Sequence, residues 1–467
     1  MTNQRYDAII IGSGIGGGTC ARRLRDGGMR VAMIERERIG GETARWASIP
    51  SATLLGPANL LWRMREAAGA KSPSLTGAAD EAGEAAIQGE SLEQLANEAQ
   101  VEYLRHEGMG IYLGAATITG PGRVAVGDQT LETERIVIAT GSDPYVPAIE
   151  GLVDSGFWTA REAISFSSLP QHVVILTGMG THAIELAQMF RMYSSEVTLV
   201  ASTKRLIPQE DPEVGELMAE HLHQSAVRVL LGRSARKVEP GPEETREVTL
   251  DDGRHVRGQA LVVAMGRTPR VAGLGLERMG IQMVGQGIRV DPYCRAAAGI
   301  WAVGDVTGSG SYIHMAQYQA RIAADDILGH PHPASYISVP RITFTDPLVA
   351  ATGLTLAQAR EQGIDVASVT VDLSEEPMRP DTAAPYAQSG IPLAERRGVD
   401  GKLTLHADRG RGTLIGAWAV APNAGDWIQH ALFAIRAETP LTVLHDMFEQ
   451  FPSFSEVYLG AVERLMG

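Results

Sequence analysis

Two glycine-rich turns, each set between an apolar strand and a helix, constrain the fold of this chain more than any other feature. In the first, the apolar run at residues 6–11 leads into a GxGxxG turn, a helical stretch follows, and a second apolar run ends at Glu35. This order and spacing predict a Rossmann-like βαβ unit. Gly12 would allow the tight turn, Gly14 the approach of a pyrophosphate, and Gly17 close packing of helix on strand. Glu35 would accept hydrogen bonds from a ribose.

The second turn predicts a second dinucleotide fold. It follows the apolar run at residues 172–176 and places Gly178, Gly180 and Ala183 in the three glycine positions, the last of which tolerates alanine. The next strand, expected at residues 197–200, is followed by Ala201, where a ribose-binding Asp or Glu would be expected.

The residues after that second strand bear on the choice of nucleotide. Ser202, Lys204 and Arg205 follow it, and a missing acid with two cations nearby favours the 2′-phosphate of NADP over NAD. Lys204 and Arg205 fit ordinary solvated residues equally well. Both interpretations stay open, and the prediction leans to NADP.

Two further strands extend the first fold. Residues 135–141 run into the small-residue turn that ends at Ser142, and residues 299–305 close on Asp305. A carboxylate at the carboxyl end of a strand can accept hydrogen bonds from a ribityl or phosphate-bearing group, although a Gly-Asp pair is also an ordinary turn former. From about residue 335 the pattern changes to alternating strands followed by helices, which indicates an α+β domain without a nucleotide motif.

Composition excludes several functions. The formal net charge of −14 argues against nucleic-acid and anionic membrane partners, because both need a basic face. Cofactor phosphates should then be held by backbone N–H groups and helix N-termini rather than by a basic field. Cys20 and Cys294, the two cysteines, are far apart in the sequence and form no disulfide or metal motif, so we expect two buried reduced thiols and no metal. Without a signal peptide or an apolar run of ~20 residues, we expect a cytoplasmic protein.

Together these motifs resemble the pyridine nucleotide–disulfide oxidoreductases, a family that includes dihydrolipoamide dehydrogenase, glutathione reductase and mercuric reductase. The resemblance spans essentially the whole chain. It rests on GSGIGG with Glu35, and on the segments GGETARWASIPS, ATGS, GMGTHAIELA, AMGRTP, WAVGD, FTDP and FPSFSE. It implies FAD in the first fold, NAD(P)H in the second, and a homodimer formed through the C-terminal domain.

We therefore predict an α/β protein with two Rossmann-like dinucleotide-binding domains plus a C-terminal α+β dimerisation domain. We expect an FAD-binding domain at residues 1–150 and 271–334, an NAD(P)-binding domain at 151–270, and an interface domain at 335–467. The resemblance implies that NAD(P) is held by Gly178, Gly180, Ala183, Ser202, Lys204, Arg205 and Gly266. It implies that FAD is held by Gly12, Gly14, Gly17, Glu35, Arg36, Gly41, Glu42, Thr43, Ala116, Thr140, Gly141, Ser142, Gly304, Asp305 and Ala316.

One departure from the family pattern bears directly on function. The family's redox loop reads GGxCxxxxCxPSK, and here Thr43 and Ser48 stand at the cysteine positions and Ala52 at the lysine position. In the family, hydride passes from nicotinamide to flavin and then to that disulfide. A hydroxyl has no accessible two-electron disulfide couple, so this last step is excluded.

Other departures affect the same region. The family's lysine pairs with the glutamate that matches Glu185, so Glu185 needs a raised pKa or another partner such as His182. Thr181 matches a tyrosine that often gates the nicotinamide pocket. Phe451 matches the catalytic histidine of the disulfide-reducing members, although Glu456, the usual partner of that histidine, remains.

A histidine after the Gly-Asp turn completes the set of candidate catalytic residues. His314 matches a histidine that the family places close to the flavin, and it could act as a general acid or base or serve as a hydrogen-bonded structural residue. The candidate catalytic residues are Thr43, Ser48, Glu185, His314, Phe451 and Glu456.

Three functions are compatible with these residues. The one that needs no missing residue is an FAD-dependent NAD(P)H oxidoreductase in which reduced FAD gives electrons directly to a quinone, an organic acceptor, oxygen or another nucleotide. Thr43, Ser48 and Phe451 would then line the acceptor pocket. The second is a specialised biosynthetic flavoenzyme that acts on one metabolite, with oxygen able to restore the flavin and nicotinamide not required. The third is a non-catalytic FAD-binding module, against which the two intact nucleotide motifs argue.

Restoring the two cysteines alone should not create a disulfide reductase. In the double variant Thr43→Cys, Ser48→Cys, the residues Ala52 and Phe451 leave the new thiolate without its cation and its base. We expect no lipoamide or glutathione reduction above the level of the unchanged chain in assays that follow NADPH or NADH oxidation. Measurable disulfide reduction by the double variant would contradict this account of the loop.

Overall fold

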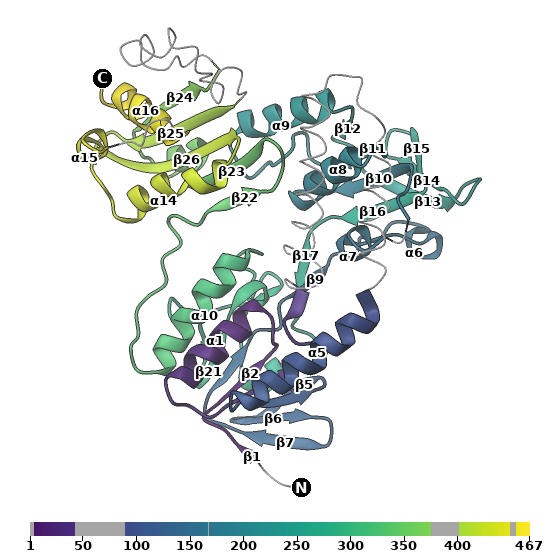
Figure 1. Cartoon of the computed structure of the whole chain (residues 1–467), viewed down its shortest axis with the longest axis vertical. Helices are drawn as coiled ribbons and strands as arrows, with labels where there is room; N and C mark the ends of the chain where they lie inside the picture. Colours follow the sequence, from purple (N-terminus) through teal and green to yellow (C-terminus); the bar gives the residue numbers. More distant parts are fainter. Residues whose placement is uncertain (1–3, 43–88, 167, 375–400, 449–453) are drawn as a thin grey trace.

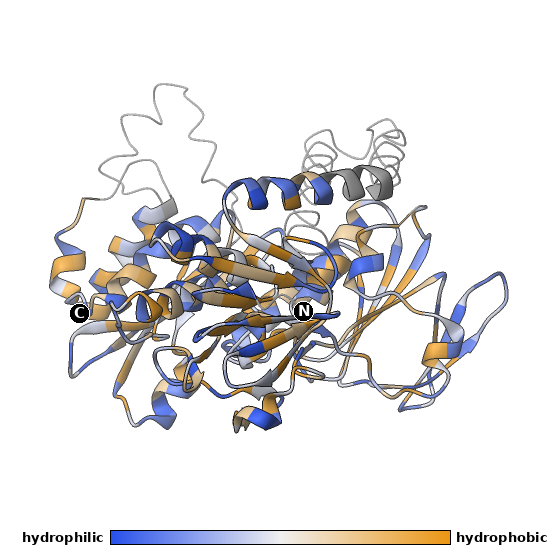
Figure 2. Cartoon of the chain, turned by 90° about the horizontal axis from the view of Figure 1, so that it is seen from below, coloured by the Kyte–Doolittle hydropathy of each residue, from blue (hydrophilic) through white to orange (hydrophobic). Residues whose placement is uncertain are grey.

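The chain folds into three lobes, which Figure 1 shows as a lower lobe and two upper lobes. The computed structural model describes residues 4–42, 89–166, 168–374, 401–448 and 454–467. The first nucleotide domain forms the lower lobe, and the second nucleotide domain and the C-terminal domain lie above it. Hydrophobic residues concentrate on the strands and on the inner helix faces in Figure 2, which places a core inside each lobe.

A six-stranded sheet forms the centre of the first nucleotide domain, because its strands are short apolar runs covered on both faces. The strand order is β20-β21-β8-β2-β3-β4, and all neighbours except β20 and β21 are parallel. Helices α1 and α10 lie side by side on this sheet (Figure 1). The elements are β1 (Gln4–Arg5), β2 (Ala8–Ile11), α1 (Ile15–Asp26), β3 (Val31–Glu35), α5 (Gly89–His106), β4 (Gly110–Leu113), β5 (Ala116–Gly120), β6 (Arg123–Val126), β7 (Gln129–Glu132), β8 (Ile136–Ile138), η2 (Leu276–Met279), β18 (Met283–Val284), β19 (Gly287–Ile288), β20 (Arg295–Ala297), β21 (Ile300–Ala302), η3 (Gly304–Thr307) and α10 (Ile313–Ile327).

The second nucleotide domain repeats the plan with a parallel sheet in the order β12-β11-β10-β16. An antiparallel sheet, β13-β14-β15, packs beside it. The elements are α6 (Leu152–Ser155), α7 (Ala160–Ala163), β10 (His172–Thr177), α8 (His182–Met192), β11 (Glu196–Ala201), α9 (Pro212–Gln224), β12 (Arg228–Leu231), β13 (Ala235–Pro240), β14 (Arg246–Leu250), β15 (His255–Gly258) and β16 (Ala260–Ala264).

The C-terminal domain is an antiparallel five-stranded sheet, β22-β23-β26-β25-β24, with helices packed on it. Its elements are β22 (Arg341–Thr343), β23 (Leu348–Gly353), α11 (Leu356–Glu361), β24 (Val366–Asp372), β25 (Lys402–Asp408), β26 (Thr413–Ala421), α13 (Ala424–Trp427), α14 (Gln429–Arg436), α15 (Leu441–His445), η4 (Phe454–Glu456) and α16 (Val457–Met466). The predicted fold class, two Rossmann-like domains plus a C-terminal α+β domain, is confirmed. Within the described ranges, no helix combines the length and apolar composition that a membrane crossing needs.

A short two-stranded ribbon connects the two nucleotide domains. Strand β9 (Ser142–Pro144) pairs antiparallel with β17 (Arg267–Pro269), so the chain leaves and re-enters the first domain at the same place. Hydrogen bonds from Tyr145 N to Gly266 O and from Arg270 N to Gly141 O, both 2.9 Å, extend the ribbon. Figure 1 shows β9 and β17 at the junction between the lower lobe and the second nucleotide domain.

The second nucleotide domain and the C-terminal domain share one hydrophobic core. Val349, Trp418 and Val420 of the C-terminal sheet are buried in the same cluster as Phe190 of α8. Polar contacts cross the same boundary: Arg341 forms an ion pair with the buried Glu210, with an Nε–Oε1 distance of 2.6 Å. Because apolar burial and a buried ion pair act together here, these two domains form one body.

Removing the indole of Trp418 should destabilise this shared core. Its side chain is 3% exposed, and a large-to-small change at such a site costs about 3–5 kcal/mol in the free energy of unfolding. Urea titrations of Trp418→Ala, followed by far-ultraviolet circular dichroism, would measure the loss. As a control, Val153→Ala should change stability by less than about 0.5 kcal/mol, because Val153 is 73% exposed. Equal losses in the two variants would contradict a shared core at Trp418.

Candidate functional site

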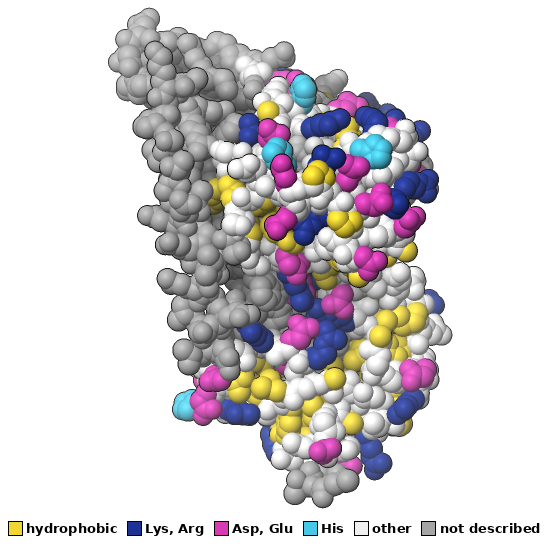
Figure 3. Space-filling view, turned by 90° about the vertical axis from the view of Figure 1, so that its right-hand side faces the viewer, with side chains coloured by type: hydrophobic (Ala, Val, Ile, Leu, Met, Phe, Trp, Pro, Cys, Tyr) yellow, Lys and Arg dark blue, Asp and Glu magenta, His cyan; other side chains and the backbone are white. Residues whose placement is uncertain are grey.

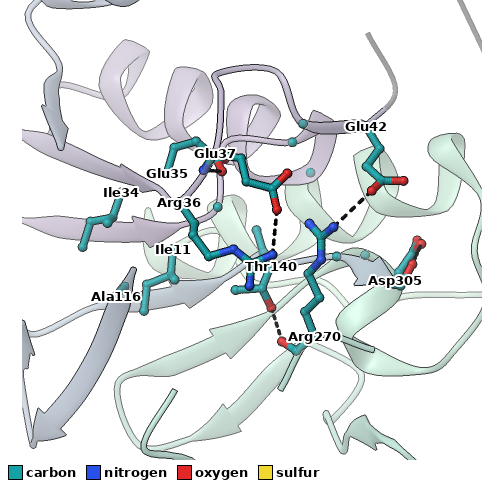
Figure 4. Close-up of a pocket in the computed structure, with 18 of the residues that line it drawn as sticks. Ile11, Ile34, Glu35, Arg36, Glu37, Glu42, Ala116, Thr140, Arg270 and Asp305 are labelled. Atoms are coloured by element: carbon teal, nitrogen blue, oxygen red, sulfur yellow. Dashed lines mark hydrogen bonds and ion pairs between the residues drawn. The ribbon is translucent and has the colours of Figure 1, made fainter. Parts of the chain in front are cut away.

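A cavity of about 520 Å³ opens at the carboxyl ends of the central strands of the first nucleotide domain. In open α/β sheets this edge is where ligands bind. Among the residues expected to hold FAD, those that line it are Gly12, Gly14, Glu35, Arg36, Gly41, Glu42, Ala116, Thr140, Gly141, Ser142, Gly304, Asp305 and Ala316 (Figure 4). Gly17 lies behind the cavity in the contact between α1 and the sheet, and Thr43 falls outside the described residues.

Steric limits differ among the three glycines of the first turn. A Cβ on Gly12, which has φ +103°, would lie 2.3 Å from the carbonyl oxygen of Ala139. A Cβ on Gly17 would lie 2.0 Å from Gly12 O, so helix α1 could not keep its place against the turn. At Gly14 a Cβ would meet nothing within 4 Å, and this residue faces the cavity. No side chain caps the N-terminus of α1, so its first amides are available to a phosphate.

Two carboxylates supply acceptors at opposite ends of the cavity. Glu35 accepts hydrogen bonds from the backbone N and Oγ of Ser13, at 2.9 and 2.6 Å, and from the backbone N of Glu37. Asp305 accepts one from Ser142 Oγ at 2.6 Å. A carboxylate has about four acceptor sites, so both side chains keep capacity for hydroxyl groups of a ligand. The cavity therefore fits a dinucleotide with hydroxyl-bearing chains on either side of a pyrophosphate.

Charged side chains line this site more densely than the net charge of the chain suggested. Five arginine side chains line the cavity, together with four carboxylates. They are Arg36, Arg38, Arg161, Arg267 and Arg270, and the carboxylates are Glu35, Glu37, Glu42 and Asp305. The overall negative charge of the chain did not reveal the near-equal numbers of arginines and carboxylates here. These residues come from distant segments of the sequence and meet only in the folded chain. Figure 3 shows basic and acidic side chains gathered at the waist between the lobes.

Three of these guanidinium groups converge on Glu42. Arg267 Nη2 lies 2.7 Å from Oε2, Arg270 Nη2 lies 3.0 Å from Oε1, and Arg161 Nη2 also binds Oε1. Figure 4 shows Arg270 reaching toward Glu42 across the mouth of the cavity. Arg270 is also bound by Asp143, with Nε 2.6 Å from Oδ1. Together, these contacts cross-link the wall of the cavity.

Glu42 remains ionised in this setting. Burial opposes its ionisation, but the positive charges of Arg267 and Arg161 and their hydrogen bonds outweigh that effect and hold the pKa of Glu42 below its ordinary value. For Arg270, burial is the largest single effect and lowers the pKa, but the hydrogen bond and charge of Asp143 and the charges of Glu42 and Glu37 together raise it above its ordinary value. The cluster is therefore a set of charged partners at neutral pH.

The second glycine-rich turn also adopts the geometry of a nucleotide site. Gly178 and Gly180 precede α8, and Ala183 is fully buried within it. A Cβ on Gly180 would approach Ala264 O to 3.1 Å, so the turn lies tightly against the sheet. Gly266, with φ +108°, follows the neighbouring strand β16. No side chain caps α8, so its first amides are available, as at α1.

The two cations that favoured NADP occupy different environments. Arg205 donates from Nη2 to the carbonyl oxygens of Pro208, at 2.8 Å, and Glu210, at 3.3 Å, and it is only partly exposed. Arg205 therefore braces the turn that follows β11, and its contribution to a phosphate site stays a prediction. Lys204 and Ser202 are exposed at the end of β11.

Glu185 lies buried in the first turn of α8 and has two partners. Its Oε2 is 2.8 Å from His182 Nδ1, and its Oε1 accepts a hydrogen bond of 2.8 Å from Phe344 N. His182 is thus the partner that the sequence suggested in place of a lysine. The contact with Phe344 ties this carboxylate to the C-terminal domain.

His314 lies at the start of α10, half-buried and stacked on Tyr312 with ring centroids 5.3 Å apart. Burial lowers the pKa of His314 below its ordinary value, and a hydrogen bond to the Pro340 carbonyl only partly offsets this. Its Nε2 is buried without a hydrogen-bond partner among the described residues. His314 and Glu185, from different domains, thus both contact the segment 340–344.

The remaining catalytic candidates contribute little to the described geometry. Glu456 ends η4 and lies half-buried at the start of α16. Thr43, Ser48 and Phe451 lie outside the described residues.

Both cysteines of the chain are buried in the core of the first nucleotide domain. Cys20 and Cys294 are fully buried in the same cluster as α1 and α10, and both are free thiols, as predicted. Burial is the main cause that raises the pKa of each thiol to about 12. Neither residue lines the cavity.

Comparisons with known proteins agree with this architecture. A family model described as pyridine nucleotide-disulphide oxidoreductase matches residues 6–320, and a model of the dimerisation domain of the same class matches residues 339–462. A mercuric reductase from Streptomyces lividans is 33% identical and covers 92% of this chain and 90% of the relative. A dihydrolipoyl dehydrogenase from Rhizobium etli is 29% identical, with 98% of each chain covered.

Solved structures give the same result. The HOCl-induced flavoprotein disulfide reductase RclA from Escherichia coli superposes with a TM-score of 0.81 at 26% identity, covering 98% of this chain and 99% of the other. LpdA from Mycobacterium tuberculosis does so with a TM-score of 0.83 at 25% identity, covering 99% and 100%.

The buried thiols should be unreactive in the native protein. A thiol with a pKa near 12 carries almost no thiolate at pH 8, and neither sulfur is accessible. Titration with a chromogenic disulfide reagent should therefore detect no thiol in the native chain, and in denaturant it should detect the two that the sequence contains. Rapid reaction of either cysteine in the folded protein would contradict its placement in the core.

Proposed function

We propose that this chain, which belongs to the pyridine nucleotide-disulphide oxidoreductase family, is an FAD-dependent enzyme that carries electrons from NAD(P)H to a small-molecule acceptor without a redox disulfide. Membership of the family supports the use of FAD and NAD(P)H. The chain's own residues argue against a redox disulfide.

The observation that carries the proposal is the state of the thiols. The sequence holds two cysteines, and both are buried in the core, away from the cavity, with pKa values raised to about 12. Exchange with a disulfide needs an accessible thiolate, and so does ligation of a soft metal ion by sulfur. Disulfide reduction and thiolate-dependent mercuric reduction, the activities that relatives' names indicate, therefore have no sulfur to use here.

The residues of the first cavity fit FAD. The α1 amides and Gly14 would receive the pyrophosphate, Glu35 would bind the ribose hydroxyls, and Asp305 would bind the ribityl hydroxyls. When bound, the flavin supplies two-electron redox chemistry, accepting hydride from nicotinamide and giving electrons to the acceptor. Gly12 and Gly17 keep the turn and helix close enough for these groups to converge.

The second glycine-rich turn supports binding of NAD(P)H. The α8 amides would receive its pyrophosphate, and exposed Lys204 and Ser202 favour the 2′-phosphate of NADPH. The acceptor that we propose is a quinone, another organic molecule, oxygen or a second nucleotide. His314 is the best-placed proton carrier, because burial keeps it neutral and its Nε2 has no partner among the described residues.

The match to a dimerisation domain supports assembly as a homodimer. We place that interface on the C-terminal domain.

Anaerobic titration of the purified FAD-loaded protein tests the proposal. Addition of NADPH, and less efficiently of NADH, should bleach the oxidised flavin absorbance near 450 nm. No long-wavelength band from a thiolate interacting with the flavin should form, because no accessible thiolate exists. Acceptors would then be screened by the rate at which they restore the oxidised spectrum.

Other results would favour the other functions. Failure of both nucleotides to bleach the flavin would reject nicotinamide-fed chemistry. Bleaching by a metabolite alone would then indicate a specialised flavoenzyme, and a flavin inert to all donors would indicate a non-catalytic module.

A further inference from the structure

Arg161 connects the sheet of the second nucleotide domain to the cavity of the first. It belongs to α7, which packs on β16. Trp158, just before α7, is hydrogen-bonded to the same sheet: its N donates to Leu261 O at 2.7 Å, and its carbonyl oxygen accepts from Val263 N at 2.8 Å. Among the described residues that line the cavity, Arg161 is the one carried by an element packed on that sheet.

Its partner, Glu42, is fixed to the other domain. The adjacent Gly41 lies directly against the first glycine turn, where a Cβ would stand 2.7 Å from Gly14 Cα. The Arg161–Glu42 contact therefore joins the sheet of the second nucleotide domain to the first glycine-rich turn, which belongs to the first domain. Arg161 also lies 3.8 Å from Glu37 Oε2 at the same wall.

The backbone connection between the two domains is slight by comparison. Strands β9 and β17 contribute three residues each, and an isolated two-stranded ribbon of this size is marginally stable. Arg267 and Arg270 brace the ribbon against Glu42, but both sit on or next to the ribbon itself. Arg161 alone among these three adds a point of attachment beyond it.

The attachment is partly shielded from water. Side-chain exposure is 27% for Arg161 and 18% for Glu42. A charge-assisted contact at this depth is stronger than a surface ion pair and less screened by salt. It can therefore resist rotation of the lobes about the ribbon.

We propose that Arg161 is a positioning residue that, through Glu42, fixes the orientation of the second nucleotide domain relative to the FAD cavity and so sets the distance for hydride transfer. This inference rests on the proposed function. Hydride transfer depends steeply on donor–acceptor placement, and a misplacement of about 1 Å can cost on the order of 100-fold in rate.

The test compares FAD-loaded Arg161→Met, Arg161→Lys and Arg257→Met with the unchanged protein. Arg257 is the control, because it forms an exposed ion pair with Glu247 on the outer sheet of the same domain. The first readout is hydrogen exchange at the ribbon amides of Tyr145 and Arg270. The second is the limiting rate of anaerobic flavin reduction at saturating NADPH, together with flavin content and nucleotide affinity.

Arg161→Met should speed exchange at the ribbon on the order of tenfold and slow flavin reduction by roughly 10- to 100-fold. Flavin content and nucleotide affinity should stay unchanged. Arg161→Lys should recover part of both effects, because it keeps the charge, and Arg257→Met should match the unchanged protein.

Several results would overturn the proposal. Unchanged hydrogen exchange with slower flavin reduction would place Arg161 in the chemical step itself. Faster hydrogen exchange with a normal rate of flavin reduction would show that Arg161 joins the domains without positioning the reactants. Loss of flavin with normal exchange would make Arg161 a cofactor ligand. If neither nucleotide reduces the unchanged protein, the proposed function fails, and the exchange comparison still decides whether the tie exists.

Discussion

The carboxylate of Glu42, bound by guanidinium groups of Arg161, Arg267 and Arg270, is the interaction that joins the wall of the first cavity to the part of the chain that forms the second nucleotide domain and its ribbon. A carboxylate at this depth needs paired charge, because burial without partners would favour its neutral form. The three arginines all come from the part of the chain between residues 151 and 270. The wall of the first cavity and the joint between the nucleotide domains are therefore one structure, and a change in either alters the other.

Above this joint, the second nucleotide domain and the C-terminal domain behave as a unit. Trp418 and Val349 complete the core beneath α8, and buried His406 lies 2.8 Å from buried Asp211 across the same boundary. Among the described residues, the first nucleotide domain is joined to this unit by the ribbon of β9 and β17, by the charged cluster, and by the segment 328–340 that leads from α10 to β22. Relative movement between two bodies, rather than among three, is thus the motion that the fold permits.

Near the segment 340–344, Glu185 is paired with a histidine rather than with a lysine. A lysine beside Glu185 could only donate hydrogen bonds, whereas a neutral imidazole such as that of His182 has one nitrogen that donates and one that accepts. His314, held neutral by burial, contacts the same segment from the other nucleotide domain. Under the proposed function, electron transfer to an organic acceptor would be accompanied by proton transfer, for which His314 is our candidate.

The sequence by itself determined the two nucleotide folds, because Gly12, Gly17 and their strand–helix context leave one compatible local geometry. It also predicted the absence of dithiol chemistry, because Thr43 and Ser48 stand at the two cysteine positions of the family's loop, and it named His182 as a partner for Glu185. It could not reveal the cluster around Glu42, because its four residues are separated by up to 228 positions and each resembles an ordinary solvated charge. The carbonyl partners of Arg205 could not be read from the sequence either, because a side chain's partners depend on tertiary packing. Local backbone conformation depends on short stretches of sequence, whereas contacts between distant charged residues depend on the tertiary structure.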